Sequence, residues 1–316
     1  MQQPVYENIE ATFSPQNLKD EIVKGLENSQ ACISPKFLYD KLGSHLFTAI
    51  TYLPEYYPTV TEREIFLKFK EEIALSMGSN HCLIDLGAGN CQKAEAMFDT
   101  IKPSTYVAVD FSIEYLQEVL PKLQGKYPEI KMMGVGMDFS NHLSLPTSLP
   151  NIQRNFFYPG SSIGNFSQAQ AGHLLDQIKS SSDQGGLLLG VDLMKEDAVL
   201  LNAYDDPLKL TAAFNLNILR VVNSLINSNF DVKDFRHTIT INHSMQRVEL
   251  YLEALRDVKV SWADGTRSFK AGELIHTENS HKYSVTSIQA LLKASGFNRF
   301  KSWTDPKDYF ALIYAQ

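Results

Sequence analysis

Two glycines and two carboxylates in the first half of the chain have the spacing of a cofactor site. Gly87 and Gly89 follow the apolar run 81–86, which contains Asp85 two positions before the first glycine. Glycines let the backbone pass close to a ligand, and a helix that follows them presents unpaired N–H groups toward it. Asp110 lies about 20 residues after Gly89, where a carboxylate can accept both hydroxyls of a ribose.

A third carboxylate, Asp138, stands next to an aromatic residue, Phe139, just after the apolar run 130–135. Such a pair suits an adenine, because the carboxylate accepts from the exocyclic amine and the ring covers the base. Taken singly, Asp110 or Asp138 is explained as well by a capping role at a strand end. Their occurrence together at these intervals favours the cofactor.

The sequence of the loop distinguishes between two kinds of cofactor. Dinucleotide enzymes carry G-x-G-x-x-G, whereas the third position here is Gln92. The order D-x-G-x-G is how class I methyltransferases begin, and their donor, S-adenosylmethionine, carries an amino acid and no pyrophosphate. The loop therefore predicts a methyltransferase, and a nicotinamide-dependent oxidoreductase remains a rival that binding of NAD would reveal.

The elements around these residues alternate. Between residues 81 and 194, short apolar runs alternate with helical patterns, which indicates parallel βαβ units. The predicted strands are 81–86, 105–109, 130–135, 155–158 and 186–193. After residue 207 the pattern changes to one long helix (207–226), an alternating strand (248–254) and a hairpin (258–262 with 267–270). A helix ending at Gly296 and two strands, 299–303 and 309–314, close the chain.

We therefore predict an α/β fold, with a parallel-rich, doubly wound Rossmann-like sheet and a second α+β domain. The first domain is expected at 60–196 and 284–316. The second, a substrate domain, is expected to combine 1–59 with 197–283.

Composition limits the partners. The net charge of −7 and the lack of a basic run argue against nucleic acid, and no apolar stretch is long enough to cross a membrane. The N-terminus lacks the features of a signal peptide, and the three cysteines are sparse, so we expect the cytoplasm. No histidine or cysteine spacing indicates a metal. A monomer that binds a small molecule is expected.

Several motifs outside the loop resemble one family, the histidine-specific Nα-methyltransferases of ergothioneine biosynthesis. They include LPEYYPT at 53–59, GSSIGNF at 160–166, AYDDP at 203–207 and ENS at 278–280. The resemblance covers nearly the whole chain. It implies trimethylation of the α-amine of L-histidine to hercynine, with S-adenosylmethionine as the donor.

The resemblance also implies site residues. Those that hold the amino acid are Tyr39, Tyr56, Gly160, Asn165, Tyr204, Glu278 and Ser280. Those that hold the cofactor are Gly87, Lys93, Asp110, Asp138 and Phe139, to which the loop motif adds Asp85 and Gly89. Asn165 and Tyr39 are expected to position the amine, Tyr204 or Asn165 to bind the carboxylate, and Glu278 with Ser280 to fix the imidazole.

One departure concerns Leu250, where the family's pocket places a methionine. The exchange conserves volume and is usually mild, but it leaves open methylation of another aromatic amino acid, as in fungal relatives that act on tryptophan derivatives. A non-catalytic binding module is a further alternative, which the complete set of polar pocket residues disfavours.

Overall fold

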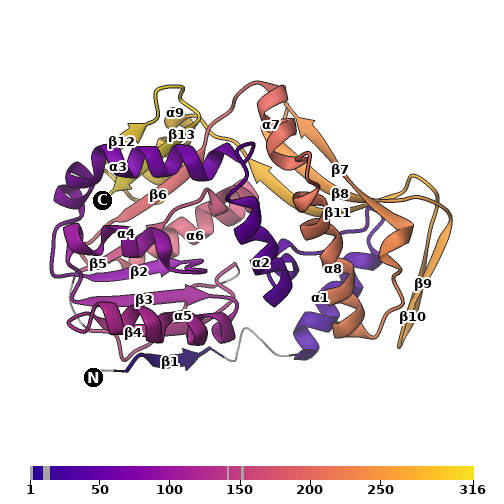
Figure 1. Cartoon of the computed structure of the whole chain (residues 1–316), viewed down its shortest axis with the longest axis horizontal. Helices are drawn as coiled ribbons and strands as arrows, with labels where there is room; N and C mark the ends of the chain where they lie inside the picture. The colour runs from indigo at the N-terminus through magenta and orange to yellow at the C-terminus, as the bar shows by residue number, and fades with distance from the viewer. Residues whose placement is uncertain (1–2, 10–14, 141, 151–152) are drawn as a thin grey trace. The chain divides into compact units, whose positions relative to one another are not determined.

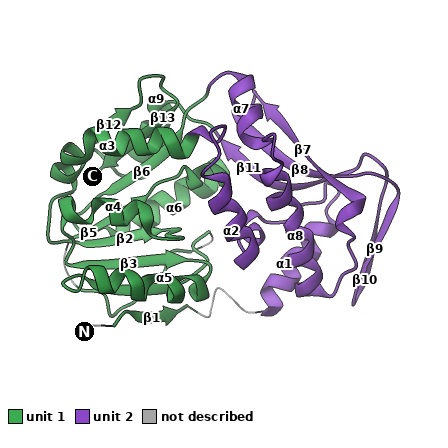
Figure 2. Cartoon of the chain, viewed as in Figure 1, with its two compact units in different colours: residues 1–12, 58–194, 282–316 green, residues 13–57, 195–281 purple. Residues whose placement is uncertain are grey.

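The computed structural model describes residues 3–9, 15–140, 142–150 and 153–316. The chain divides into two compact units, coloured separately in Figure 2. Unit 1 comprises residues 1–12, 58–194 and 282–316, and unit 2 comprises residues 13–57 and 195–281. Each unit therefore combines segments that lie far apart in the sequence.

Unit 1 is built on an eight-stranded sheet with the order β1-β4-β3-β2-β5-β6-β13-β12 (Figure 1). Its strands are β1 (Val5–Asn8), β2 (Cys82–Leu86), β3 (Thr105–Asp110), β4 (Lys131–Gly136), β5 (Arg154–Tyr158), β6 (Leu187–Asp192), β12 (Phe300–Thr304) and β13 (Phe310–Ala315). All pairings are parallel except the two that β13 makes, with β6 and with β12. The predicted parallel-rich sheet is confirmed.

Helices cover both faces of this sheet. Helices α3 (Tyr57–Met77), α4 (Gln92–Ile101) and α5 (Ile113–Lys126) pack on the face that contains Leu83. Helices α6 (Gln168–Ser181) and α9 (Val285–Ala294) pack on the opposite face, which contains Ile84. Burial on both sides explains why the central strands read as continuous apolar runs rather than alternating ones.

The strand order reverses between β2 and β5. From β2 the chain proceeds outward to β3 and β4, and then returns to add β5 on the other side of β2. In open α/β sheets, ligands bind at such a switch point, beyond the carboxyl ends of the strands. This topology directs attention to the loops that follow β2 and β5.

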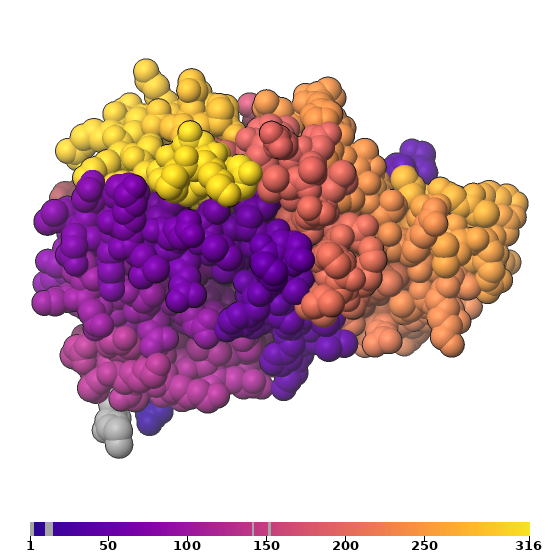
Figure 3. Space-filling model, turned by 45° about the horizontal axis from the view of Figure 1, so that its top comes forward, coloured from indigo at the N-terminus to yellow at the C-terminus, as the bar shows by residue number. Residues whose placement is uncertain are grey.

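The C-terminal strands pack beside α3. The indole N–H of Trp303 in β12 donates to Glu72 Oε2 at 3.2 Å, and Phe310 in β13 is buried in the same core as Ile65 of α3. In the space-filling view the yellow C-terminal segment accordingly adjoins the purple surface of α3 (Figure 3). The last segment of the chain is thus an integral part of unit 1.

The assignment of all residues 1–59 to the second domain is wrong at its start. β1 pairs in parallel with β4, with Val5 opposite Met133 and Asn8 opposite Gly136, and so extends the sheet of unit 1. A four-residue edge strand carries too little periodicity to be recognised locally. Its place is decided by the open edge of β4, which is contributed by residues far along the chain.

Unit 2 has a helical and a β part. Its helices are α1 (Pro15–Glu27), η2 (Pro35–Leu38), α2 (Lys41–Ile50), α7 (Asp197–Tyr204), α8 (Leu210–Ile226) and η4 (Val232–Asp234). Its strands are β7 (Phe235–Asn242), β8 (Arg247–Ala254) and β11 (Leu274–His281) in one antiparallel sheet, with β9 (Val258–Trp262) and β10 (Gly265–Phe269) as a hairpin. The predicted hairpin and alternating strand are confirmed. No described helix, in either unit, is long and apolar enough to span a bilayer.

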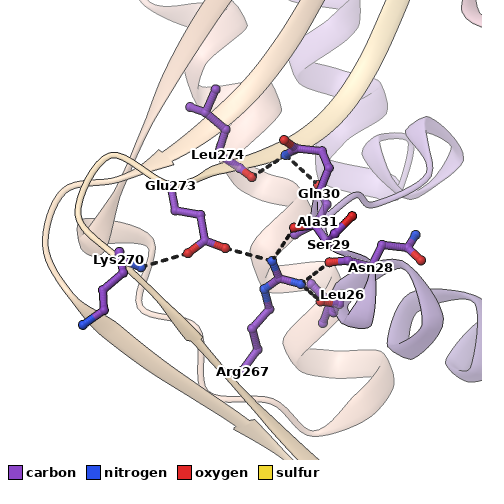
Figure 4. A network of polar contacts seen from close by, with 9 residues as sticks. All are labelled: Leu26, Asn28, Ser29, Gln30, Ala31, Arg267, Lys270, Glu273 and Leu274. Carbon is purple, nitrogen blue, oxygen red and sulfur yellow. Dashed lines mark hydrogen bonds and ion pairs between the residues drawn. The ribbon is translucent and has the colours of Figure 1, made fainter.

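An arginine connects the hairpin of unit 2 to α1 (Figure 4). The guanidinium of Arg267 donates to the carbonyl oxygens of Leu26, Asn28 and Ser29, which lie at and just beyond the end of α1. It also forms an ion pair with Glu273 at 2.8 Å. Because the last carbonyls of a helix lack intrahelical partners, this contact both caps α1 and anchors it.

Candidate functional site

The loop after β2 is shaped to approach a ligand. Gly87 and Gly89 have φ values of +68° and +51°, which side-chain-bearing residues rarely adopt, and a Cβ built on either would meet no atom within 4 Å. The loop leads into the first turn of α4 at Gln92. Its glycines are therefore required by backbone conformation, and open space borders them where a ligand can enter.

Asp110 is tied to that loop. One carboxylate oxygen accepts from Gly89 N at 2.8 Å, and the other accepts from Ser112 N at 3.0 Å. Burial raises the pKa of Asp110, while these backbone N–H groups oppose the rise. The carboxylate is thereby fixed in direction at the end of β3, next to the loop.

Asp85 lies beneath the loop in β2. It is 2% exposed and accepts a hydrogen bond from Tyr106 OH at 2.7 Å. Burial raises the pKa of Asp85 to about 7, against the opposing effects of the Tyr106 hydrogen bond and the charge of Lys93. A cationic group brought to this carboxylate would favour its ionised form.

Asp138 and Phe139 follow β4, the strand next to β3. Asp138 is buried, and its Oδ1 accepts from the backbone N–H and the hydroxyl of Ser140. The ring of Phe139 packs edge-on against Tyr158, with centroids 5.9 Å apart. The residues predicted to hold the cofactor therefore share the carboxyl edge of neighbouring strands β2, β3 and β4, except Lys93, which lies in the first turn of α4.

Glu62 of α3, which the sequence did not predict as a site residue, connects Lys93 of α4 with the loop after β5. Its side chain is 2% exposed; Oε2 lies 2.5 Å from Lys93 Nζ, and Oε1 accepts from Gly160 N at 2.7 Å. A Cβ at Gly160 would lie 2.8 Å from Lys93 Nζ, and a Cβ at Gly190 would lie 2.7 Å from Glu62 Oε1. Both glycines are thus needed for this close approach. A helical glutamate carries no local signal of such a role.

Asn165 and Gly160 belong to the segment that follows β5. Gly160 and Ser161 both have positive φ values, of +78° and +62°, and Ser161 Oγ accepts from Asp192 N at 2.9 Å. The short helix η3 (Ser162–Asn165) then ends at Asn165, whose side chain is partly exposed. Two of the predicted substrate residues therefore lie in unit 1, in the segment that follows β5 at the switch point, and Gly160 lies beside Lys93.

The remaining substrate residues lie in unit 2. Tyr39 packs edge-on against Phe47, and Phe47 packs edge-on against Tyr56. Tyr56 in turn lies 6.4 Å from Tyr204, measured between ring centroids. Tyr204 OH is 2.7 Å from Ser280 Oγ. Residues from α7, β11 and the N-terminal segment are thereby connected in one series of contacts.

A bulge in β11 determines which side chains join this series. Ile275 pairs with Leu252 and His276 with Tyr251, but the register then skips Thr277, so that Glu278 lies opposite Leu250. Directly opposed residues point to the same face of a sheet. The skipped residue therefore turns Glu278 and then Ser280 onto the buried face, where they are 7% and 6% exposed.

The described part of the chain gives little support to metal binding or to catalysis by a thiol. No group of three or more His, Cys, Asp or Glu side chains there could hold a metal ion. Cys82 and Cys91 are buried, and burial raises the pKa of Cys82 to about 12. A thiol so disposed is a poor nucleophile.

Comparisons with known proteins bear on this arrangement. A family model described as "Histidine-specific methyltransferase, SAM-dependent" matches residues 18–316. The histidine N-alpha-methyltransferase of Mycobacterium tuberculosis is 35% identical over 306 residues, covering 94% of each chain. The protein of that name from Mycolicibacterium smegmatis is 34% identical over 313 residues, covering 96% of each. Ergothioneine biosynthesis protein 1 of Schizosaccharomyces pombe is 30% identical over 304 residues, covering 92% of this chain and 38% of that protein.

Proposed function

Since this chain belongs to the histidine-specific, S-adenosylmethionine-dependent methyltransferase family, we propose that it methylates the α-amine of L-histidine, up to hercynine, in ergothioneine biosynthesis. The observation that carries the proposal is the buried polar cluster of unit 2. There Glu278 lies opposite Leu250, and Ser280 contacts Tyr204 OH. Carboxylate and hydroxyl groups beside an apolar wall suit an imidazole ring.

The residues of unit 1 fit the cofactor. When bound, S-adenosylmethionine supplies a methyl group activated by a sulfonium. The open space beside Gly87 and Gly89 admits a ligand against the backbone, and the buried carboxylate of Asp85 suits its amino group. The others keep the roles expected from the sequence: Asp110 binds the ribose, Asp138 with Phe139 binds the adenine, and Lys93 is a further cofactor residue.

The protein's own contribution to the reaction is chiefly orientation. Methyl transfer needs a neutral amine whose lone pair points along the line of displacement, and holding reactants in that geometry accounts for much of such catalysis. In this proposal Asn165 and Tyr39 orient the amine, and Tyr204 or Asn165 binds the carboxylate. No covalent nucleophile is needed.

Selectivity for histidine is assigned to Glu278 and Ser280. A site built to pair with a substrate N–H rejects analogues that lack it, because its buried polar groups would then be left unpaired. Both side chains are almost completely buried, so water cannot readily replace the imidazole. Leu250, their apolar neighbour, would contact the face of the ring.

Product identification tests the proposal. The purified protein is incubated with S-adenosylmethionine and an equimolar pool of the amino acids, and the products are identified by mass spectrometry. Mono-, di- and trimethylated histidine are expected, with fragmentation placing the methyl groups on the α-amine. Methylation of tryptophan or tyrosine in preference to histidine would instead favour the alternative left open by Leu250, and ring methylation would contradict the assignment of the amine.

We further propose that the protein acts as a monomer in the cytoplasm. The free, buried thiols of Cys82 and Cys91 suit a reducing compartment, and the family's amino-acid substrate requires no macromolecular partner. Light scattering coupled to size exclusion would test the first statement, and cell fractionation the second.

A further inference from the structure

A histidine that the proposed reaction does not use lies behind the substrate residues of unit 2. His237 is in β7, on the strand face shared with Leu252 of β8. Its Nδ1 is 2.9 Å from Asn215 Nδ2, and its Nε2 is 2.9 Å from the backbone oxygen of Tyr204. The imidazole therefore connects α8, through Asn215, with the end of α7, at Tyr204.

The contacts of Asn215 determine which nitrogen of His237 donates and which accepts. Asn215 is fully buried on α8, and its Nδ2 also donates to the carbonyl of Tyr251 at 3.1 Å. An amide oxygen in that position would face a carbonyl oxygen, so the amide nitrogen must be the atom that faces His237. Nδ1 of His237 consequently accepts, and Nε2–H donates to the oxygen of Tyr204.

The environment keeps this tautomer neutral. Burial lowers the pKa of His237, and the charge of Lys209 lowers it further, while the Tyr204 carbonyl and the carboxylates Asp205 and Asp206 oppose the fall. Protonation would also bring an N–H against the amide N–H of Asn215. The imidazole thus has one donor and one acceptor, each matched to a different element.

The carbonyl that His237 binds belongs to the last residue of α7, where helices leave their oxygens without intrahelical partners. The side chain of that same residue, Tyr204, extends to Ser280 Oγ at 2.7 Å and packs edge-on toward Tyr56. Fixing the backbone of Tyr204 therefore fixes where its hydroxyl lies relative to β11.

We propose that His237, oriented by Asn215, is a positioning residue for histidine binding: it acts by holding Tyr204 and, through it, Ser280. This inference rests on the proposed function, because it assigns importance to Tyr204 and Ser280 as substrate residues. All of these side chains belong to unit 2. The effect should therefore appear in the Michaelis constant for histidine, while the affinity for the cofactor product, governed by unit 1, stays unchanged.

Two substitutions distinguish the hydrogen bonds of His237 from the volume that its side chain fills. His237→Leu keeps an apolar volume but neither donates nor accepts, and it should raise the KM for histidine roughly tenfold, as expected for the loss of a buried hydrogen bond. His237→Gln offers an acceptor and a donor on one planar group, and it should restore most of the loss. Should the leucine variant fail to fold, His237→Asn, which is too short to reach both partners, replaces it.

The matched control is His243→Gln. His243 also contacts α7, through Asp197 at 3.1 Å, but its side chain is 65% exposed. The His243→Gln variant should leave the KM for histidine unchanged. Isothermal titration with S-adenosylhomocysteine accompanies every variant, and its Kd should remain that of the wild type.

The outcomes are distinguishable. If Tyr204→Phe raises the KM while His237→Leu does not, the positioning proposal is wrong and the substrate site stands. If Tyr204→Phe itself leaves histidine kinetics unchanged, the assignment of Tyr204 fails, and this inference fails with it. Equal losses in the leucine and glutamine variants, accompanied by weaker S-adenosylhomocysteine binding, would indicate a general structural role and likewise overturn the proposal.

Discussion

The loop of unit 1 and strand β11 of unit 2 bring functional groups together in different ways. In the loop, Gly87 and Gly89 act through their backbone conformation, with two positive φ angles, and the Asp110 carboxylate accepts from Gly89 N. In β11, Glu278 and Ser280 act through side chains, and a single skipped residue turns them inward. The conformation of the loop is encoded by neighbouring residues, whereas the orientation of the β11 side chains depends on the register between strands.

Because of this difference, substitutions in the two regions should affect different properties of the enzyme. Backbone changes at the loop should weaken cofactor binding without altering the choice of amino acid. Side-chain changes on β11 should alter that choice and leave cofactor binding intact. The predictions that follow test this separation, beginning with the largest expected effect.

Gly89→Val should cause the greatest loss. Valine is strongly disfavoured at φ +51°, and its side chain would enter the open space that the ligand needs. We expect S-adenosylhomocysteine to bind on the order of a hundredfold more weakly, about 2.7 kcal/mol, by isothermal titration. The control is Gly272→Val, which has a φ of +84° and is equally open, but lies in unit 2. It should lose comparable stability and no cofactor affinity; equal losses of affinity would contradict a specific role for the loop.

Glu278→Ala should lower kcat/KM for histidine by roughly a hundredfold, because the imidazole N–H loses its buried partner. Relative activity toward apolar aromatic amino acids should rise, as measured in competition assays. Glu253→Ala is the control, since Glu253 lies on the other face of the same sheet, paired with exposed Arg236 at 2.7 Å. Unchanged histidine kinetics in the Glu278 variant would remove this carboxylate from the selectivity argument.

Cofactor binding should depend on pH through Asp85. Burial raises the pKa of Asp85 to about 7, so the carboxylate is ionised above that pH and protonated below it. A cationic ligand prefers the ionised form, so affinity for S-adenosylhomocysteine should fall as pH falls through 7, by about tenfold per unit below it. Asp85→Asn should bind weakly at every pH and flatten the profile. If the wild-type affinity for S-adenosylhomocysteine does not change between about pH 5 and about pH 8, the assignment of Asp85 to the cofactor's amino group is wrong.

Arg267→Ala should produce the smallest effect, confined to the stability of unit 2. The Arg267 side chain is 15% exposed and binds three carbonyls at and just beyond the end of α1, so its loss should cost about 1–3 kcal/mol in the free energy of unfolding. Urea denaturation measures the change. Arg236→Ala, which removes a largely exposed ion pair, should cost at most about 1 kcal/mol. Weaker S-adenosylhomocysteine binding in the Arg267 variant would contradict the separation of the two units.

Sequence patterns predicted much of unit 1 because its signals are local. Strands buried on both faces appear as unbroken apolar runs, and β2, β3, β4, β5 and β6 occupy the predicted positions within a few residues. The glycine loop could be recognised because only glycine accommodates its positive φ angles readily. The edge strand β1 escaped detection, since four residues carry no comparable period.

The polar partners behind the site could not be predicted in the same way. Glu62 on α3 and His237 on β7 meet their partners across 98 and 33 positions of the chain, at Gly160 and Tyr204 respectively. A buried glutamate in a helix or a histidine in a strand has no distinctive neighbours in sequence. Their roles arise only when packing excludes water and leaves each polar atom with one available partner.

The sequence by itself therefore determined the alternating α/β core, the glycine loop with its carboxylates and, through family motifs, the identities of the residues proposed to bind histidine. The tertiary structure decided the placement of β1, the register that turns Glu278 toward Leu250, and the contacts of Glu62 and His237. The physical reason is that backbone conformation is encoded within a few residues, whereas hydrogen-bond partnership in a buried interior depends on which distant segments pack together.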